Sequence, residues 1–587
     1  MDYALKTSDA SGERQTLGSA WRALKPLLAG EKRNVIVAVA CVTWTTISQL
    51  LAPVLNARVI DTAIPHKDYT LLLLYAGGLA VVYLIALRTS FVQTVRMGTV
   101  GRNVLFKLRN RLFGQLSRLP IAFFAQNRAG DLISRVNSDT DKINLFFSQA
   151  LMQMFGNLFL VAGTGVLLLA LNWRMGLIAL VPAAAMLVIT QVLSPWVKKS
   201  SRRSMESLGA LSADISESLA NFRVILAFNR RDYFRQKFDA ANQRNYRASV
   251  TSGVASGLFM PLYTLAGSAA QVLVLGLGVW LISRHELTVG LLVGYLLYVT
   301  SFYNPLRQLA TVWSSWQTML AAMDRVSEVL NLENNLVQEA DAGTGQAGHL
   351  LAFEDVDFSY PGGKPVLNKV RLTLERGRTY ALVGPTGGGK TTTAMLMARL
   401  YDPTSGKVFL DGRDIRGLDA AERAAKIGFI LQDPFLIAGT IRDNIVYGHA
   451  ELAALDEAQL TDLMAARGLT GFLARFGEAG LATPVKGTGD GLSLGQKQLV
   501  AFLRAVLREP EILILDEATA NIDTVTEQML EEVLAKLPKS TTKVIIAHRL
   551  NTIQNADEIF FVGGGALTAA GSMEHAMGML LSHERTS

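Results

Sequence analysis

GPTGGGKTT, at residues 384–392, is the stretch of the chain from which its organisation follows. An apolar, strand-like run (379–383) precedes it and a helical run (393–398) follows it, which is the sequence context of a phosphate-binding loop. Its glycines let backbone N–H groups approach phosphates, its lysine neutralises their charge, and its first threonine can ligate Mg²⁺. We therefore predict nucleotide contacts from Gly384, Pro385, Thr386, Gly387, Gly388, Gly389, Lys390, Thr391 and Thr392.

The composition divides the chain into an apolar first part and a soluble second part. Its 587 residues are too many for one core. A mean hydropathy of +0.26, with 18% charged residues, is too apolar for an ordinary soluble protein. The single cysteine, Cys41, excludes a disulfide within the chain. The net charge is +8, but the excess basic residues lie between apolar stretches, so we expect no nucleic-acid binding.

Apolar stretches without Asp, Glu, Lys or Arg recur through the first part of the chain. Each supplies the roughly 20 residues that cross a bilayer. We predict six transmembrane helices, in the stretches 34–57, 69–87, 143–173, 175–197, 248–283 and 287–306. The long connections, 88–142 and 198–247, contain many more Lys and Arg residues than the short ones, and their apolar spacing is helical over 100–119 and 208–228. The positive-inside rule then predicts that the N-terminus, the long connections and the C-terminal half are cytoplasmic. We expect the protein in the cell (inner) membrane.

The polar residues of the apolar stretches leave two interpretations open. Arg88 either extends to the membrane interface or contacts an anionic ligand in a cavity. A larger set of polar and aromatic residues either lines a cavity for a small amphipathic substrate or packs between helices. This set is Gln49, Gln149, Gln153, Asn157, Gln191, Gln271, Trp44, Tyr295, Tyr298 and Tyr303.

A polar, glycine-containing stretch at 333–349 indicates a linker between the two parts. We predict four segments: an N-terminal segment (1–33), an all-helical transmembrane domain (34–325), a linker (326–349) and an α/β nucleotide-binding domain (350–587). Strand-like runs at 350–358 and 370–374 precede the phosphate-binding loop. Tyr360 follows the first of them and is suited to stack on adenine.

Further polar residues follow two apolar strands beyond the loop. The run EILILDE (511–517) ends in two carboxylates, of which Asp516 is expected to reach Mg²⁺ and Glu517 to polarise an attacking water. A second strand (543–547), which we predict to lie beside the Asp516 strand, precedes His548, so this histidine can bridge γ-phosphate and water. LSLGQ (492–496) precedes a helical run (497–507) and indicates a second helix N-terminus suited to an anion.

Together these features resemble the half-size ATP-binding cassette (ABC) exporters, and the resemblance covers essentially the whole chain. It implies a six-helix transmembrane domain followed by a P-loop ATPase domain of the ABC type, with ATP and Mg²⁺ as ligands. Segments 119–124 and 130–135 also resemble the first cytoplasmic coupling region of these exporters. The motif assignments are the adenine-stacking Tyr360, the Walker A loop (384–391), the Q-loop Gln432, the signature residues Ser493, Leu494, Gly495 and Gln496, the Walker B Asp516, the D-loop Asp523 and the switch His548. The resemblance implies catalytic roles for Glu517, His548 and Lys390, and Mg²⁺ contacts from Thr391, Gln432 and Asp516.

Two positions depart from the family pattern. Leu494 stands where the signature usually has glycine, and the segment 485–489 lacks a glutamate that many members have. By resemblance, two nucleotide-binding domains enclose two ATP molecules, and the signature of each subunit completes the site of the other. The expected partner is therefore a second half-transporter. The variant signature favours a heterodimer, and a homodimer stays open.

Other functional classes fit less well. The six spans exclude a soluble GTPase or kinase, and importers of this superfamily usually carry their two parts on separate chains. We expect an ATP-driven exporter of an amphipathic drug, lipid or peptide-like substrate. The alternative from a different class is a nucleotide-gated channel or sensor on the same fold. The presence of Glu517 and His548 argues against it, because these residues favour ATP turnover.

Overall fold

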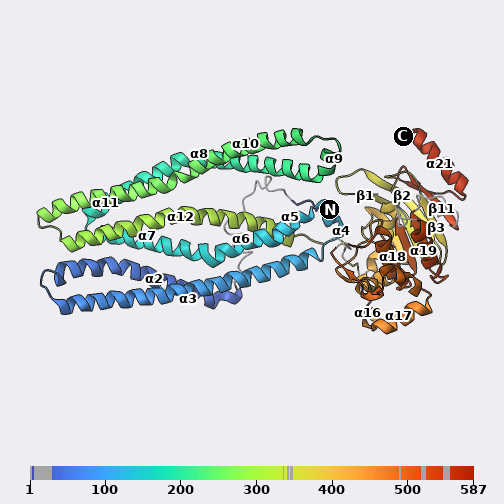
Figure 1. Ribbon diagram of the computed structural model, residues 1–587, viewed down its shortest axis with the longest axis horizontal. Helices are drawn as coiled ribbons and strands as arrows, with labels where there is room; N and C mark the ends of the chain where they lie inside the picture. Colours follow the sequence, from blue (N-terminus) through green and yellow to red (C-terminus); the bar gives the residue numbers. More distant parts are fainter. Residues whose placement is uncertain are drawn as a thin grey trace. The chain divides into compact units, whose positions relative to one another are not determined.

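The computed structural model describes residues 3–5, 29–334, 336, 338–339, 343, 348–487, 491–516, 524–546 and 556–586 (Figure 1). The chain divides into two compact units. The helical unit comprises Lys6–Ser117 and Ala129–Asn331, and the sheet unit comprises Leu332–Ser587 with Met1–Leu5 and Arg118–Arg128. The fold class predicted from the sequence, helical and then mixed α/β, is confirmed.

Among its described residues, the helical unit contains six helical segments that are long and apolar enough to cross a membrane, as predicted. They run over Lys32–Ala63, Tyr69–Leu116, Ala129–Leu171, Trp173–Ala220, Arg231–Ser283 and Val289–Leu330. The long helices are α2 (Lys32–Arg58), α3 (Tyr69–Leu116), α7 (Leu151–Leu171), α8 (Trp173–Ala220), α10 (Arg231–Gly257), α11 (Phe259–Ser283) and α12 (Val289–Leu330). Shorter elements are η1 (Ala29–Glu31), η2 (Val59–Ala63), α5 (Ala129–Ser134), η3 (Arg135–Asp139), α6 (Thr140–Leu145), η4 (Phe146–Ala150) and α9 (Phe222–Ala227).

Several of these helices are longer than a bilayer is thick. Helices α3 and α8 contain 48 residues each. At a rise of 1.5 Å per residue each is about 72 Å long, more than twice the hydrocarbon thickness of about 30 Å. The predicted helical character of the long connections is therefore confirmed over 100–116 and 208–220, which continue the membrane helices, and over the separate helix α9, whereas residues 117–119 are not helical.

Buried tyrosines hold the middle of the helical unit together. α12 packs against α2, α7 and α11 (Figure 1). The hydroxyls of Tyr295, Tyr298 and Tyr303 on α12 donate to the backbone carbonyls of Leu168, Leu50 and Ala179, at 2.8, 2.5 and 2.9 Å. The hydroxyl of each tyrosine thereby uses its one hydrogen in a bond to a neighbouring helix. For these three residues the structure favours the packing interpretation over the cavity-lining one.

In the part of the sheet unit that the structure describes, there are a six-stranded, mostly parallel sheet and a four-stranded antiparallel sheet. The six-stranded sheet has the order β12 (Ala566–Ala569), β11 (Glu558–Gly563), β3 (Thr379–Val383), β10 (Thr542–Ile546), β9 (Ile512–Asp516) and β6 (Ile427–Ile430), of which β12 is antiparallel. The antiparallel sheet has the order β2 (Pro365–Leu374), β1 (Leu351–Ser359), β4 (Ser405–Leu410) and β5 (Arg413–Asp414), and β7 (Gly439–Thr440) pairs with β8 (Pro484–Val485). The helices are α4 (Ile121–Gln126), α13 (Lys390–Met397), η5 (Ile415–Gly417), α14 (Ala420–Lys426), α15 (Ile441–Ile445), α16 (Ala450–Ala454), α17 (Glu457–Ala466), η6 (Thr470–Phe476), η7 (Gly480–Ala482), α18 (Leu494–Val506), α19 (Thr524–Ala535) and α21 (Met573–Thr586).

The register of the parallel strands brings their carboxyl ends to one edge. β9 is buried along its whole length and lies between β6 and β10. Ile546 pairs with Asp516 and also with Leu382, so β3, β10 and β9 end at the same level. Ligands of such sheets bind outside the carboxyl ends of the strands.

Candidate nucleotide-binding site

The phosphate-binding loop joins the buried strand β3 to helix α13. The helix begins at Lys390, and its N-cap, Gly389, has a φ of +107°. Gly384 and Gly387 also have positive φ values, of +152° and +80°. Because only glycine adopts such angles without strain, the loop backbone can turn sharply and present N–H groups at the N-terminus of α13.

Gly384 also lies against a neighbouring strand. A Cβ atom on Gly384 would lie 2.0 Å from the carbonyl oxygen of Val562, on β11. β11 pairs with β3, with Phe561 opposite Val383, so the loop leaves the sheet directly beside the backbone of β11. The position accepts no side chain unless the two strands move apart.

We expect Gly384→Ala to destabilise the folded protein by about 3 kcal/mol, because it adds backbone strain and a clash with a backbone oxygen. The matched control is Gly477→Ala, since Gly477 has a φ of +79° and open space around its Cβ position. This control carries the backbone strain alone, at φ +79° and ψ −169°, and should cost less, about 1–2 kcal/mol. Equal losses of thermal stability in the two full-length variants would contradict the argument.

Lys390 and the two predicted magnesium ligands meet at the same edge of the sheet. Lys390 is 6% exposed, and its Nζ donates to the carbonyl oxygens of Gly384 and Pro385 at 2.9 and 3.0 Å. The hydroxyl of Thr391 donates to Oδ1 of Asp516 at 3.3 Å. Asp516 is 5% exposed and ends β9. The site therefore combines a buried ammonium group with a hydroxyl and a carboxylate.

This donor set fits a nucleoside triphosphate with a magnesium ion. Mg²⁺ prefers oxygen ligands and is usually bound by one or two protein oxygens together with substrate phosphates. Thr391 and Asp516 supply such oxygens within hydrogen-bonding distance of each other. The glycine loop, Lys390 and the start of α13 would hold the phosphates.

Tyr360 lies beside the phosphate-binding loop. Its hydroxyl is 3.0 Å from Oγ1 of Thr392, and its ring packs edge-on against Phe358 and Tyr401. Burial raises the pKa of the Tyr401 hydroxyl. The Tyr360 ring is thus fixed in direction by aromatic neighbours, and its side chain is half-buried.

Gln432 lies two residues beyond β6, in an exposed segment. Hydrogen bonds connect the residues that follow it to helix α18. Arg504 on α18 donates to the carbonyl oxygens of Phe435 and Asn444, at 3.2 and 2.7 Å. Its guanidinium also lies over the Tyr447 ring, and burial lowers its pKa. Arg504 therefore links the segment that follows Gln432 to the signature helix. Its identity as a link was not predicted from the sequence.

The signature residues begin α18. The helix starts at Leu494, three residues earlier than the run expected from the sequence, because Ser493 and Gln496 form a capping box. Leu494 is 40% exposed. A Cβ on Gly495 would lie 3.0 Å from the Thr526 side chain, so this glycine permits close packing of α18 on α19. Glu517, Asp523 and His548 lie outside the described residues.

Comparisons with known proteins agree with this arrangement. Residues 35–306 match the family model of the ABC transporter transmembrane region, and residues 367–520 match that of the ABC transporter. The chain is 32% identical to an uncharacterized ABC transporter ATP-binding protein, YfiC, of Bacillus subtilis, over 97% of this chain and 93% of that protein.

Two further relatives have names that state a transport function. The fatty acid ABC transporter ATP-binding/permease protein of Mycobacterium tuberculosis is 31% identical over 84% of this chain and 77% of that protein. The multidrug resistance ABC transporter ATP-binding and permease protein of Lactococcus lactis is 30% identical over 85% of this chain and 82% of that protein. The chain is therefore a multi-pass membrane member of the ABC transporter family, of half-transporter size, in which ATP hydrolysis is coupled to transport.

Proposed function

We propose that this chain is one half of an exporter that moves a small amphipathic substrate out of the cytoplasm, or out of the inner leaflet, by alternating access. The observation that carries the proposal is the 3.3 Å contact between Thr391 and Asp516 at the sheet edge, in a chain that also has six helices able to span a membrane. The relatives named for fatty acids and for multidrug resistance support an amphipathic substrate.

Each residue of the nucleotide site has a proposed role. The loop backbone and Lys390 hold the ATP phosphates, and Tyr360 stacks on adenine. Thr391, Gln432 and Asp516 hold Mg²⁺, which would neutralise charge on the phosphates. Glu517 orients or deprotonates the attacking water, His548 contacts the water and the γ-phosphate, and Asp523 belongs to the subunit interface.

The proposed coupling depends on two copies of the nucleotide domain. ATP held by Walker A of one subunit is also contacted by Ser493 and the start of α18 in the other. ATP therefore favours the closed pair, because its phosphates bind that state better than the open one. Hydrolysis removes the shared contacts and resets the membrane helices.

The topology proposed from the Lys and Arg distribution places the N-terminus and the ATPase domain in the cytoplasm, at the cell (inner) membrane. The proposed domains are 34–325 for transport and 350–587 for ATP hydrolysis, joined by 326–349. Protease accessibility in sealed vesicles of known orientation tests this topology. Digestion of the ATPase domain only from the cytoplasmic face is expected.

Transport in inverted membrane vesicles tests the function. An exporter accumulates a labelled amphipathic compound against its gradient only when ATP is hydrolysed. A nucleotide-gated channel would dissipate the gradient after ATP binding alone. ATP-dependent accumulation that Glu517→Gln abolishes supports the exporter, and flux that a non-hydrolysable ATP analogue sustains contradicts it.

We propose a heterodimer as the working assembly. Half-size transporters of this family generally dimerise, and the signature of this chain, with Leu494, would act on the partner's ATP site. We expect the purified chain to be inactive alone and to gain substrate-stimulated ATPase activity when a second half-transporter is co-expressed. The measurement is ATP turnover of each preparation at equal protein concentration.

The control for this experiment is the oligomeric state of the chain alone. A stable homodimer with substrate-stimulated ATPase activity would refute the obligate heterodimer. In a heterodimer whose second site lacks a catalytic glutamate, Glu517→Gln in this chain alone should remove nearly all turnover of the complex.

A further inference from the structure

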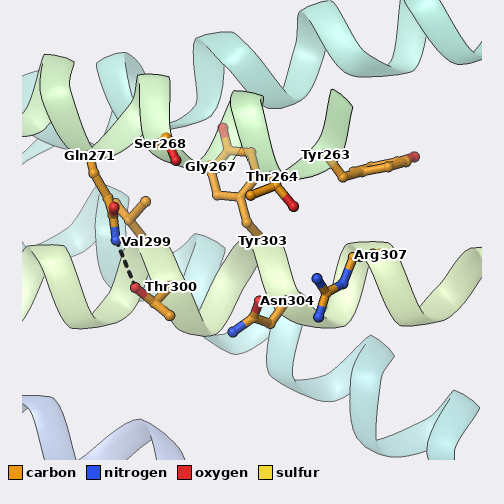
Figure 2. Close-up of a pocket in the computed structure, with 10 residues that line it drawn as sticks. All are labelled: Tyr263, Thr264, Gly267, Ser268, Gln271, Val299, Thr300, Tyr303, Asn304 and Arg307. Atoms are coloured by element: carbon orange, nitrogen blue, oxygen red, sulfur yellow. Dashed lines mark hydrogen bonds between the residues drawn. The ribbon is translucent and has the colours of Figure 1, made fainter. Parts of the chain in front are cut away.

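A cavity of about 180 Å³ lies between α11 and α12 in the helical unit (Figure 2). Its lining includes Tyr263, Ser268 and Gln271 from α11, and Thr300, Asn304 and Arg307 from α12. Figure 2 shows Tyr263 and Arg307 toward one end of the cavity and the hydrogen bond from Gln271 to Thr300, of 3.0 Å, at the other. Thr300 and Arg307 are seven residues apart, about 10 Å along the helix.

Among the described residues that line the cavity, Arg307 alone carries a formal charge. It is half-buried and makes no hydrogen bond or ion pair with another described residue. The neighbouring helices α11 and α7 contain no charged residue that could neutralise the guanidinium of Arg307. The next charged residue on α12 is Asp324, about 25 Å further along the helix. Arg174 and Lys198 bound the uncharged part of α8. An unpaired guanidinium beside an apolar stretch is costly unless an anion or water compensates it.

The other polar side chains of the cavity are neutral and include possible donors. The Tyr263 hydroxyl is 3.4 Å from the Thr190 hydroxyl, and the exposed Asn304 amide makes no hydrogen bond with another described residue. The Tyr303 hydroxyl is occupied by its bond to Ala179, so its ring only closes the cavity. The Arg307 end therefore offers one cation and neutral donors, and no carboxylate.

Apolar surface continues the cavity on both helices. On α11, Met260, Thr264, Ser268 and Val272 follow one another at four-residue spacing and share one face. Val272 is 68% exposed, and Leu297 on α12, three residues before Thr300, is 38% exposed. A ligand with its charged group at Arg307 can therefore extend an apolar chain past the Gln271–Thr300 bond onto Val272 and Leu297.

We propose that this cavity binds a single anionic headgroup carried on an apolar chain, with Arg307 as the residue that selects the negative charge. The inference deepens the proposed export function and rests on it, since it names the substrate class. The same chemistry is offered by a transported amphiphile and by an anionic bilayer lipid. Arg88, for which the sequence left an anionic ligand open, is exposed and lies over the Phe91 ring, and it does not line this cavity.

The test measures equilibrium binding to the full-length protein, with its partner half if one is required, in phosphatidylcholine nanodiscs without ATP. The probes are dodecanoate, dodecanol and dodecyltrimethylammonium below their micelle concentrations. We expect dodecanoate to bind about tenfold or more tightly than dodecanol, which corresponds to about 1.4 kcal/mol. Arg307→Gln should reduce this ratio to about one, Arg307→Lys should retain part of it, and Arg307→Glu should favour the cationic probe.

Arg88→Gln is the matched control, since it removes a different arginine of the helical unit and should leave the ratio unchanged. Equal binding of the three probes to the unmodified protein, or a ratio that survives Arg307→Gln, would overturn the proposal. Inorganic phosphate alone should not compete, because the site also requires the apolar chain. Strong competition by phosphate would count against the proposal.

Two further measurements are needed. The first distinguishes a bilayer lipid from a transported substrate as the ligand, and the second distinguishes failure of the cavity proposal from failure of the export proposal. Competition by phosphatidylglycerol in the nanodisc would support the site and assign it to a bilayer lipid, and lack of competition would assign it to a transported amphiphile. Arg307-dependent binding without ATP-driven accumulation in vesicles would contradict export and leave the site standing. Accumulation of dodecanoate that is independent of Arg307 would overturn this inference alone.

Discussion

Glu517→Gln is expected to bind ATP with nearly unchanged affinity and to hydrolyse it about 10²- to 10⁴-fold more slowly, the range that a positioned general base contributes. The substitution keeps the size of the side chain and removes the negative charge that activates water. Glu517 follows Asp516 directly in the sequence, and Asp516 ends β9 beside Thr391. The measurements are steady-state ATP turnover and equilibrium nucleotide binding of the purified protein.

Glu511→Gln is the matched control for this prediction. Glu511 directly precedes β9, so it stands at the opposite end of the same strand. It pairs with Arg376 at 2.5 Å and with Lys426 at 3.5 Å, on a surface far from the carboxyl edge of the sheet along the strand. We expect a modest loss of stability and near-normal turnover in Glu511→Gln. Near-normal turnover in Glu517→Gln would contradict the assignment of Glu517.

The parts of this fold that depend on local sequence were predictable. The phosphate-binding loop is recognised because its glycines, lysine and threonine lie between a strand and a helix that are adjacent in the chain. The six spans follow from the length of the uncharged stretches. The pairing of the Asp516 strand with the strand before His548 was also predicted, and β9 and β10 are indeed neighbours.

The parts that depend on contacts distant in the sequence were not predictable. Val562 limits the space at Gly384 because β11 pairs with β3. No local sequence pattern specifies which strand of the chain lies beside β3. The tyrosines of α12 illustrate the same limit, since a tyrosine that lines a cavity and one that bonds a neighbouring helix have the same spacing along their own helix. Only the packed neighbours reveal that Tyr303 donates to Ala179.

Arg307 was missed for a related reason. It is the first charged residue after the last apolar stretch, which is where arginines commonly extend to the membrane interface. What distinguishes it is the cavity formed with α11, and the lack of any charged residue on α11 and α7. The first feature is tertiary and could not be deduced from α12 alone.

Lys390→Ala is expected to weaken ATP binding itself, in contrast to Glu517→Gln. Lys390 is 6% exposed, and its Nζ already lies among the loop oxygens, bonded to the carbonyls of Gly384 and Pro385. Removing it takes away a cation that contacts phosphate before any reaction. A hydrogen bond to a charged group contributes about 1.5–3 kcal/mol, so the loss corresponds to roughly 10- to 100-fold in affinity.

Thermal stability at a fixed ATP concentration separates this effect from damage to the fold. At an ATP concentration of 100 times the dissociation constant, bound nucleotide stabilises the unmodified protein by about 2.7 kcal/mol. If Lys390→Ala binds ATP 100-fold more weakly, the same concentration stabilises it by only about 0.4 kcal/mol. Lys539→Ala, which changes an exposed lysine of the same unit, should keep the full ATP-dependent shift. Lys390 also donates hydrogen bonds to the carbonyl oxygens of its own loop, so Lys390→Ala should lose a little stability even without ATP. The deciding measurement is therefore the increase in stability that ATP produces. A full ATP-dependent increase in Lys390→Ala would refute a contact between Lys390 and phosphate in the ground state.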